Sequence, residues 1–319
     1  MRLVPAEGPL LEEVLDLTFP IWGEGLSRGA YGQWNAAQLK TTWGRQHLRR
    51  FALLDGQGRL LASAKRYRLP ARLDGKDGFV SGLGAVFTHP DHRSRGYGTA
   101  ILEYLIEEAQ QDGALAAALF SEIGSSFYER LGFAAVPVDQ VSIDVASKKG
   151  SPAMLVRAGD ERDLPNIAAM DQVRSEGARF ALRRDVPLIQ YAIAKKRLQA
   201  GLGPAGRKQV EFFVAEEGAS AVAYVVITVS SDGWTLEEAG DRDPAAARLG
   251  AMLQVLVARE PSHTAPVIRA WWPRAFPVPP QLRLADRVDA RDLLMLRPLV
   301  DLPRPLDAAD VFYWRSDYF

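Results

Sequence analysis

The sequence predicts an α/β fold built as two similar domains in tandem. The chain has 319 residues, more than one domain usually contains. A buried strand, a glycine-rich loop and an amphipathic helix follow one another over residues 79–111. A similar order of strands and helices recurs in the second half, which indicates an internal duplication. We therefore place the first domain at residues 1–147 and the second at residues 153–319.

The composition is that of an ordinary globular protein. Hydrophobic residues make up 47% of the chain, and 39 basic side chains balance 39 acidic ones. This balance gives no global attraction to nucleic acid or to an anionic membrane. The absence of cysteine excludes disulfides, thiolate metal sites and a cysteine nucleophile, and with four scattered histidines we expect no metal site. Neither a membrane-spanning run nor a signal peptide is found, so we expect a cytoplasmic protein.

The N-terminal region predicts a short strand at residues 2–4 and a helix in which leucines recur at helical spacing over residues 10–17. The stretch that follows, up to residue 48, is polar and predicts irregular structure. Three tryptophans recur there: Trp22, Trp34 and Trp43. We expect them either to fill the core or to line an acceptor cleft, because aromatic rings with a polar edge suit both places.

Residues 51–69 predict a β-hairpin, because Asp55 and the glycines beside it supply a turn between two apolar runs. The next strand is expected at residues 79–87. Gly82 and Gly84 within it indicate a bulge or the close approach of another backbone. A ligand lying alongside as an additional strand would suit this stretch.

The helix after the glycine-rich loop has one apolar face, opposite a face rich in glutamate. That apolar face consists of Ile101, Leu102, Leu105, Ile106 and Ala109. Gly113 is expected to end the helix. Residues 114–120 then predict a buried strand, residues 121–133 a turn and a short helix, and residues 141–145 a last strand.

Residues 147–152 are small and polar and end in proline, which predicts a linker. Beyond it the order of elements recurs. The expected strands lie at 154–157, 212–215, 221–229, 234–238, 267–271 and 293–296, and the expected helices start within 161–170 and span 244–259.

A glycine-rich loop between a strand and a helix is suited to binding phosphate. The first N–H groups of a helix have no partner within the helix, and the helix dipole favours an anion there. A pyrophosphate needs several such donors close to the backbone, which a loop with little side-chain bulk can offer.

The sequence of this loop, Arg93-Ser94-Arg95-Gly96-Tyr97-Gly98, resembles the Arg/Gln-x-x-Gly-x-Gly/Ala signature of the GNAT superfamily of acyl-CoA-dependent N-acetyltransferases. Residues 127–133, FYERLGF, are similar to a second landmark of that family. The resemblance implies, for each domain, a mixed and mostly antiparallel central sheet flanked by helices. It also implies acetyl-CoA as the cosubstrate. The implied acetyl-CoA-binding residues are Val86, Phe87, Arg93, Ser94, Arg95, Gly96, Tyr97, Gly98 and Thr99. The two arginines either meet phosphates or remain surface charges.

Tyr128 is the candidate general acid. A phenol with a pKa near 10 is protonated at neutral pH and can donate a proton to the departing CoA sulfur. The alternative is a tyrosine that merely packs in a helix. The general base is harder to place, because the family often has a glutamate on the strand before the loop, where this chain reads Gly-Ala-Val-Phe at residues 84–87. Candidates acting through water are Glu122, Glu24, His89 and His92.

The second half resembles a GNAT domain in its pattern but not in its chemistry. In place of the glycine loop it has acidic residues at 239–244, with Asp243 expected as the N-cap and Pro244 as the first helical residue. Carboxylates there would satisfy the helix end and repel a pyrophosphate. The region 278–282 offers no counterpart of Tyr128. We therefore expect a degenerate, non-catalytic domain.

The tandem arrangement resembles mycothiol synthases and the enhanced-intracellular-survival aminoglycoside acetyltransferases. Ser121-Glu122 and Gly132-Phe133 favour the second group, whose members carry a third, sterol-carrier-like domain for which this chain is too short. In that group the C-terminal carboxylate reaches the active site. The aromatic tail, residues 311–319, either docks on a core groove or brings the carboxylate of Phe319 into the acceptor cleft as the missing base.

The predicted function is direct transfer of an acetyl group from acetyl-CoA to a primary amine of a small molecule or peptide. Tyr128, Phe319 and Glu122 are the candidate catalytic residues, and Trp22 and Glu24 are the candidate acceptor-binding residues. We expect neither nucleic acid nor a membrane as partner, and the sequence leaves a homo-oligomer open. The alternative is a non-catalytic acyl-CoA-binding sensor or scaffold.

Overall fold

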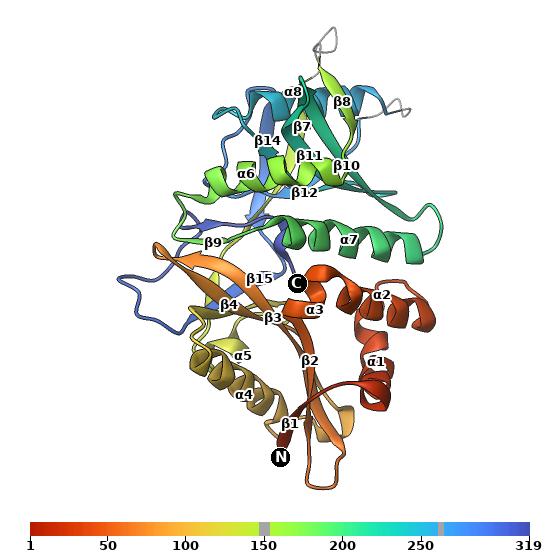
Figure 1. Cartoon of the computed structure of the whole chain (residues 1–319), viewed down its shortest axis with the longest axis vertical. Helices are drawn as coiled ribbons and strands as arrows, with labels where there is room; N and C mark the ends of the chain where they lie inside the picture. Colours follow the sequence, from red (N-terminus) through yellow and green to blue (C-terminus); the bar gives the residue numbers. More distant parts are fainter. Residues whose placement is uncertain (147–153, 261–264) are drawn as a thin grey trace. The chain divides into compact units, whose positions relative to one another are not determined.

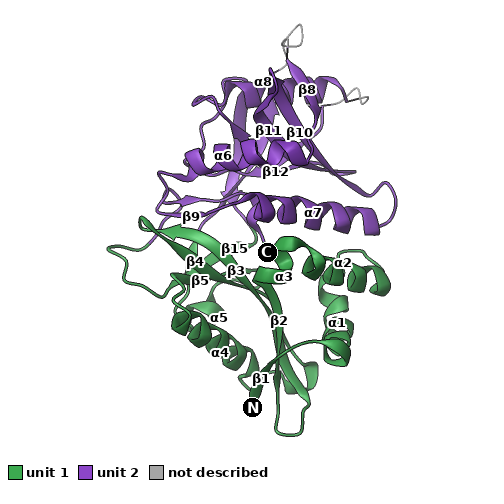
Figure 2. Cartoon of the chain, viewed as in Figure 1, with its two compact units in different colours: residues 1–136, 291–305, 319 green, residues 137–290, 306–318 purple. Residues whose placement is uncertain are grey.

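The computed structural model describes residues 1–146, 154–260 and 265–319, so the predicted linker at 147–152 lies outside the described residues. The chain divides into two compact units (Figure 2). The first unit comprises residues 1–136, 291–305 and 319, and the second comprises residues 137–290 and 306–318. Within the described ranges, no helix is both long and apolar enough to cross a membrane.

The first unit contains a sheet with the strand order β1-β2-β3-β4-β5-β15-β6. Its strands are β1 (Arg2–Pro5), β2 (Leu48–Leu54), β3 (Leu60–Leu73), β4 (Lys76–Thr88), β5 (Ala116–Ser121), β15 (Leu293–Pro298) and β6 (Ala134–Val136). Along this path only β4 and β5 run parallel. The sheet is therefore mixed and mostly antiparallel, as the sequence predicts.

Helices cover both faces of this sheet (Figure 1). On one face lies α4 (Tyr97–Gln111), whose predicted apolar residues are all buried against Leu53 and Leu83. On the other face lies α1 (Gly8–Trp22), which packs on Ala52 and Leu54. Helix α4 ends as predicted: Gly113 has a φ of 78°, and the next N–H, of Ala114, donates to the carbonyl of Ala109 over 2.9 Å.

The stretch before residue 48 is not irregular, and that prediction is wrong. It forms α2 (Arg28–Lys40) and α3 (Thr42–His47). Hydroxyl caps start both helices: the Ser27 Oγ accepts from an N–H of α2 over 3.2 Å, and the Thr41 Oγ1 accepts from an N–H of α3 over 2.9 Å. The polar sequence hides these helices because α2 has little apolar periodicity. Trp43 is 1% exposed, which confirms it as a core residue.

The second unit repeats this architecture, with the strand order β8-β10-β11-β12-β13-β7-β14. Its strands are β8 (Leu155–Ala158), β10 (Lys208–Glu217), β11 (Ser220–Ser230), β12 (Gly233–Asp241), β13 (Ile268–Trp271), β7 (Asp139–Val145) and β14 (Leu282–Asp289). Again a single neighbouring pair, β12 and β13, is parallel. The helices are α6 (Leu164–Ser175), α7 (Val186–Leu202) and α8 (Ala247–Ala258), and β9 (Phe180–Leu182) pairs with β16 (Val311–Phe312). The shared strand order confirms the predicted duplication.

Two strands are exchanged between the halves of the sequence. Strand β7, expected as the last strand of the first domain, lies in the sheet of the second unit, and β15 from the second half lies in the sheet of the first. Both occupy the same place, next to the parallel pair. Local sequence pattern identifies a strand but not its pairing partner, so the exchange is invisible in the sequence. The domain boundaries at 147 and 153 remain a prediction. The compact units differ from those domains because they exchange β7 and β15.

A buried ion cluster lies inside the second unit. It consists of Asp171, Arg184, Glu238 and Asp317. The Arg184 guanidinium lies 2.5 Å from the Glu238 carboxylate and 3.3 Å from each of the other two carboxylates. Burial raises the pKa of Asp171 to about 7 against the attraction of Arg184, and the two other carboxylates raise it further.

This cluster predicts a pH dependence of stability. An aspartate in the unfolded chain has a pKa of about 3.9, so between pH 4 and 7 folded Asp171 keeps a proton that the unfolded chain loses. The free energy of unfolding should therefore fall as pH rises across that window, by roughly 1–4 kcal/mol. Asp171→Asn should remove this part of the slope in urea titrations at pH 5 and pH 8. Asp144→Asn, at an exposed ion pair in the same unit, is the control. Equal slopes in the wild type and Asp171→Asn would contradict this assignment.

Candidate active site

The glycine-rich loop of the first unit presents an uncapped helix N-terminus. Gly96 is the N-cap of α4 with a φ of 82°, and Ser94 also has a positive φ, 61°. No side chain caps the helix, and its first turn carries no acidic residue. Within the first unit, all of which the structure describes, the N–H groups of residues 95–99 have no hydrogen-bond partner. They are therefore available to an anion.

Arg93 and Arg95 flank this N-terminus and are exposed. Neither guanidinium forms an ion pair or hydrogen bond with a residue that the structure describes. Gly98 lies close to the end of β4, because a Cβ atom built on it would be 3.0 Å from the Thr88 hydroxyl and 3.8 Å from the Phe127 ring. The arrangement fits a pyrophosphate, with backbone donors and two free cationic side chains.

Strand β4 diverges from β5 beside this loop. The parallel pairing runs from Val80 to Gly82 and then stops, although β4 continues to Thr88. A bulge between Gly84 and Phe87, where Ala85 has a φ of 47°, bends β4 further. The backbone of the last third of β4 therefore lacks a strand partner on this side within the first unit. An extended ligand can pair with such a free edge.

Tyr128 lies on α5 (Ser126–Glu129) and is 8% exposed. Its ring meets those of Phe127 and Phe133 edge to face, at centroid distances of 4.9 and 6.1 Å. Phe127 in turn approaches Gly98, which brings the segment to the glycine-rich loop. Burial, and secondarily the charge of Glu122, raises the pKa of Tyr128, so the phenol is protonated at neutral pH.

Phe319, the last residue, lies against the glycines of β4. A Cβ atom built on Gly84 would be 3.3 Å from a carboxylate oxygen of Phe319 and 3.7 Å from its carboxylate carbon. A Cβ atom on Gly82 would be 2.8 Å from the Phe319 ring. The predicted close approach at these glycines is confirmed, and the approaching group is the chain's own C-terminus.

Aromatic contacts hold the Phe319 ring in the first unit. Its centroid is 5.1 Å from that of Tyr67 on β3 and 5.3 Å from that of Phe120 on β5. Tyr67 also stacks on Trp43 at 6.5 Å. Such contacts each contribute about 0.5–1.5 kcal/mol beyond the area they bury. Sequence reasoning missed Tyr67 and Phe120, because each reads as one residue of a strand and no local signal links either to the C-terminus.

The other predicted site residues are more exposed. Glu122 follows the end of β5 and is exposed, and Trp22 is the half-buried last residue of α1. Glu24 is exposed, with a φ of 52°. The role of Trp22 and Glu24 in acceptor binding stays a prediction. His89 accepts a hydrogen bond from the N–H of Asp91 over 3.3 Å, which makes it part of the turn.

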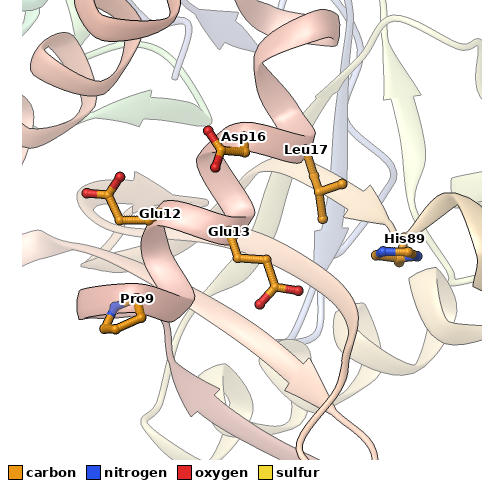
Figure 3. Close-up of a pocket in the computed structure, with 6 residues that line it drawn as sticks. All are labelled: Pro9, Glu12, Glu13, Asp16, Leu17 and His89. Carbon is orange, nitrogen blue, oxygen red and sulfur yellow. The ribbon is translucent and has the colours of Figure 1, made fainter.

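A shallow surface pocket of the first unit lies beside α1 (Figure 3). It is lined by Pro9, Glu12, Glu13, Asp16, Leu17 and His89. Glu13, Leu17 and His89 converge in Figure 3, whereas Glu12 and Asp16 lie on another side of the helix and pair with Arg28. Neither Tyr128 nor Phe319 lines this pocket. It is therefore distinct from the arrangement around β4.

Residues 25–136 match a family model described as an acetyltransferase (GNAT) domain. The first unit contains a GNAT domain. The family predicted from the loop and from the segment at 127–133 is thus confirmed, and with it the N-acetyltransferase class. The match covers the loop, β4, β5 and Tyr128 but not Phe319. A comparison with curated protein sequences finds no match.

Solved structures share the fold over nearly the whole chain. A probable N-acyltransferase of unknown function from Enterococcus faecalis V583 has a TM-score of 0.68 at 12% identity, covering 93% of this chain and 72% of that one. A GCN5-related N-acetyltransferase from Kribbella flavida has a TM-score of 0.67 at 18% identity, covering 93% and 70%. Eis1 from Mycobacterium abscessus has a TM-score of 0.56 at 15% identity, covering 94% and 74%. At these identities the likeness shows the fold alone, and it confirms two GNAT-like sheets in tandem.

The second unit closes its own counterpart of the glycine-rich loop. Asp243 and Pro244 were expected at the start of the helix, but α8 begins at Ala247 after Ala246, whose φ is 54°. Asp241 serves as the cap instead: its Oδ2 accepts from the N–H of Leu249 over 2.8 Å. The prediction erred by placing the helix too early, because β12 runs on to Asp241 and a turn follows. The inference that a carboxylate satisfies this helix end is confirmed.

A guanidinium completes this closure. Arg174 of α6 donates to the carbonyl of Asp241 over 3.0 Å, to that of Pro244 over 3.0 Å and to that of Asp243. Asp241 is 1% exposed, and burial raises its pKa. Side chains therefore occupy the place where the GNAT domain has free N–H groups.

A carboxylate placed at the start of α4 should reproduce this closure. Thr99 is the third residue of the helix, where an aspartate stabilises the helix by about 0.3–1 kcal/mol through the dipole. The same charge near a pyrophosphate should cost about 1–4 kcal/mol. We expect Thr99→Asp to weaken CoA binding at least ~10-fold by calorimetry without lowering the melting temperature. Thr99→Asn is the neutral control, and equal affinity in both variants would contradict the assigned site.

Proposed function

We propose that the chain transfers an acetyl group from acetyl-CoA to a primary amine of a small molecule or peptide. The observation that carries this proposal is that the Phe319 carboxylate lies beside Gly84 of β4. The GNAT family often has a glutamate base on this strand, and this chain has none at residues 84–87. The uncapped N-terminus of α4 supports acetyl-CoA as the donor. The proposed cytoplasmic location rests on sequence alone.

Acetyl-CoA would bind along the loop and β4. The N–H groups of residues 95–99 would hold the pyrophosphate, with Arg93 and Arg95 as counter-charges. The pantetheine arm would pair with the free edge at Val86 and Phe87, where backbone N–H groups can stabilise the charge that develops on the thioester oxygen. Asp241 and Arg174 close the equivalent place in the second unit, so we infer one acyl-CoA site per chain.

The reaction would be a direct attack, without a covalent enzyme intermediate. The acceptor attacks as the neutral amine, after its ammonium form has lost a proton to solvent. As the nitrogen bonds to the thioester carbon, the Phe319 carboxylate accepts a proton from that nitrogen. The C–S bond breaks, and the Tyr128 hydroxyl donates its proton to the departing sulfur. Its raised pKa keeps that proton in place until a thiolate develops. Glu122, whose charge acts on Tyr128, would tune this donor.

A thiol-release assay tests the function. Because the chain contains no cysteine, a thiol-reactive chromogenic disulfide reports only the CoA that is released. Acetyl-CoA should release thiol with at least one class in a panel of amino acids, polyamines, aminoglycosides and lysine peptides. Acetyl-CoA binding by calorimetry without turnover on any of them would instead favour a non-catalytic acyl-CoA sensor.

Tyr128→Phe should lower kcat by about 10²–10⁴-fold if the phenol is the general acid. The affinity for CoA should stay within about twofold, because the ring contacts with Phe127 and Phe133 are kept. Steady-state kinetics with calorimetry for CoA measures both quantities. Tyr97→Phe, a tyrosine of the loop outside this role, is the matched control. Unchanged kcat in Tyr128→Phe would remove this residue from the mechanism.

A single residue appended after Phe319 should also abolish fast turnover. An added glycine moves the carboxylate by up to about 3.8 Å while leaving the Phe319 ring in place. We expect kcat to fall at least ~10²-fold, with the KM for acetyl-CoA within about twofold. Phe319→Leu, which keeps the carboxylate and loses only ring contacts, should retain most of kcat. Full activity in the extended chain would refute the base assignment.

A further inference from the structure

A row of paired residues crosses β2, β3 and β4 at the place where Phe319 approaches the sheet. Arg50 of β2 is paired with Lys65 of β3, and Lys65 is paired with Gly84 of β4. Side chains of residues that lie directly opposite each other on neighbouring strands share one face of the sheet. Arg50 and Lys65 are therefore on the face where the Phe319 carboxylate lies beside Gly84.

Both of these side chains are buried cations. Arg50 is 6% exposed and Lys65 is 8% exposed. In the first unit, whose residues the structure describes in full, no other charged side chain is buried. Taking an ion out of water is costly unless a charge of opposite sign accompanies it, and a guanidinium does not lose its proton in proteins. This face of the sheet therefore carries positive charge without a buried acidic side chain of the same unit.

The hydrogen-bond partner of Arg50 is neutral. Its Nη2 donates to the Oδ1 of Asn35 in α2 over 3.3 Å. Its Nη1 is buried and has no hydrogen-bond partner among the described residues. Burial lowers the pKa of Arg50, against the neighbouring hydroxyls of Tyr31 and Tyr67. One side of the guanidinium is thus open to a group that accepts hydrogen bonds.

A hydroxyl on the same face is also without a partner. Ser63 of β3 is paired with Ala52, two residues from Arg50 along β2, so its side chain lies on the face of Arg50. Its Oγ is buried and makes no hydrogen bond with any residue in the described part of the chain. Buried polar atoms nearly always have a partner, so two open donors on one face indicate a ligand that accepts hydrogen bonds.

Helix α2 covers this face with polar and aromatic side chains. Tyr31, Trp34, Asn35 and Gln38 recur at helical spacing and so form one side of the helix. Asn35 contacts Arg50, and the Lys65 ammonium lies 5.4 Å from the centroid of the Trp34 ring. Amide, hydroxyl and aromatic groups of this kind line sites for polar ligands. The same residues account for the weak apolar periodicity of α2.

The chemistry of the open donors selects an oxyanion. A guanidinium presents parallel N–H groups that match the two oxygens of a carboxylate or of a phosphate. The Ser63 hydroxyl can donate to the same group, and the Lys65 ammonium adds a second positive charge. A cationic ligand would meet repulsion here, because both buried charges are positive.

We infer that Arg50, together with Lys65, binds an oxyanion of the acceptor, so that the acceptor is an amine that also carries a carboxylate or a phosphate. The inference rests on the proposed function, which places the amine of the same molecule at the Phe319 carboxylate. Neighbouring strands are about 4.8 Å apart, so the backbones of Arg50 and Gly84 are separated by about 10 Å. A small zwitterion can span that distance, with its ammonium end toward Phe319 and its anionic end toward Arg50. Polyamines and aminoglycosides, which carry several positive charges, would be poor acceptors.

Matched pairs of acceptors test the inference in the thiol-release assay. The acidic members are glycine, β-alanine, γ-aminobutyrate, ε-aminocaproate and aminopropylphosphonate. Each is compared with the alkylamine that remains when its acidic group is removed. Hydrogen bonds to a charged group are strong enough that the best acidic member should exceed its alkylamine by ~10–100-fold in kcat/KM. The phosphonate arm distinguishes a phosphate-like group from a carboxylate.

Substitution of Arg50 should remove this preference. Arg50→Met should lower kcat/KM for the preferred acidic acceptor by ~10–100-fold and leave that of the matched alkylamine within about twofold. Arg49→Met is the control, because Arg49 is the next residue of β2, is exposed and donates to the carbonyl of Arg45 over 2.6 Å. If Arg50→Met does not fold, Arg50→Lys keeps the charge without the parallel donors and should weaken the preference at least ~3-fold.

Calorimetry measures the anion site without turnover. The best acidic acceptor should bind the wild type and Arg49→Met with equal affinity, and Arg50→Met at least ~10-fold more weakly. Equal affinity for Arg50→Met, or a preference for acidic acceptors that survives this substitution, would overturn the inference. Equal kcat/KM within every acceptor pair would overturn it too. Binding that depends on Arg50 without turnover of any amine would instead contradict the proposed function and leave the anion site in place.

Discussion

The divergence of β4 from β5 after Gly82 is the constraint on which the site depends. While the two strands are paired, neither their backbone groups nor the space between them is available to a ligand. Past Gly82 the bulge at Ala85 turns β4 away, which frees its edge close to the N-terminus of α4. The proposed donor site and the proposed base therefore share this stretch of β4, because the Phe319 carboxylate lies beside Gly84.

The exchange of β7 and β15 makes the two halves of the sequence interdependent. Strand β15 lies between β5 and β6, so residues 1–136 alone would leave β6 without a partner and β5 paired on one side only. The same holds for β7 between β13 and β14. Neither half of the sequence therefore supplies all the strands of its sheet. Phe319 is exchanged in the same way, because it belongs to the first unit although it follows residues of the second.

Much of the first unit could be predicted from local pattern. The hairpin, the apolar face of α4 and the loop at 93–98 depend on residues near one another in sequence, and the structure contains all of them. The sequence analysis did not predict the helices α2 and α3, because hydroxyl caps rather than apolar periodicity mark them. Pairing between distant strands leaves no local trace, so the exchange could not be foreseen.

The candidate site was predictable to the same extent. Tyr128 and the loop follow from short motifs, whereas the contacts of Phe319 with Tyr67 and Phe120 join residues that are hundreds of positions apart. The two glycines of β4 carried the only local sign of that contact. Gly82 and Gly84 predicted that some group approaches β4 closely, but not which group.

The start of α4 and the start of α8 show how small a change separates a ligand site from a structural one. Both follow the strand that forms the parallel pair, and both begin after a residue with a positive φ. At α4 that residue is glycine and no side chain caps the helix, so the N–H groups stay free. At α8, Asp241 reaches the third N–H and Arg174 fills the space around it. The Asp241 carboxylate and a bound anion would compete for the same N–H group. Because Asp241 is part of the chain, its effective concentration at that N–H group is far higher than that of a free ligand. Closing the N-terminus of this helix therefore requires no change of fold.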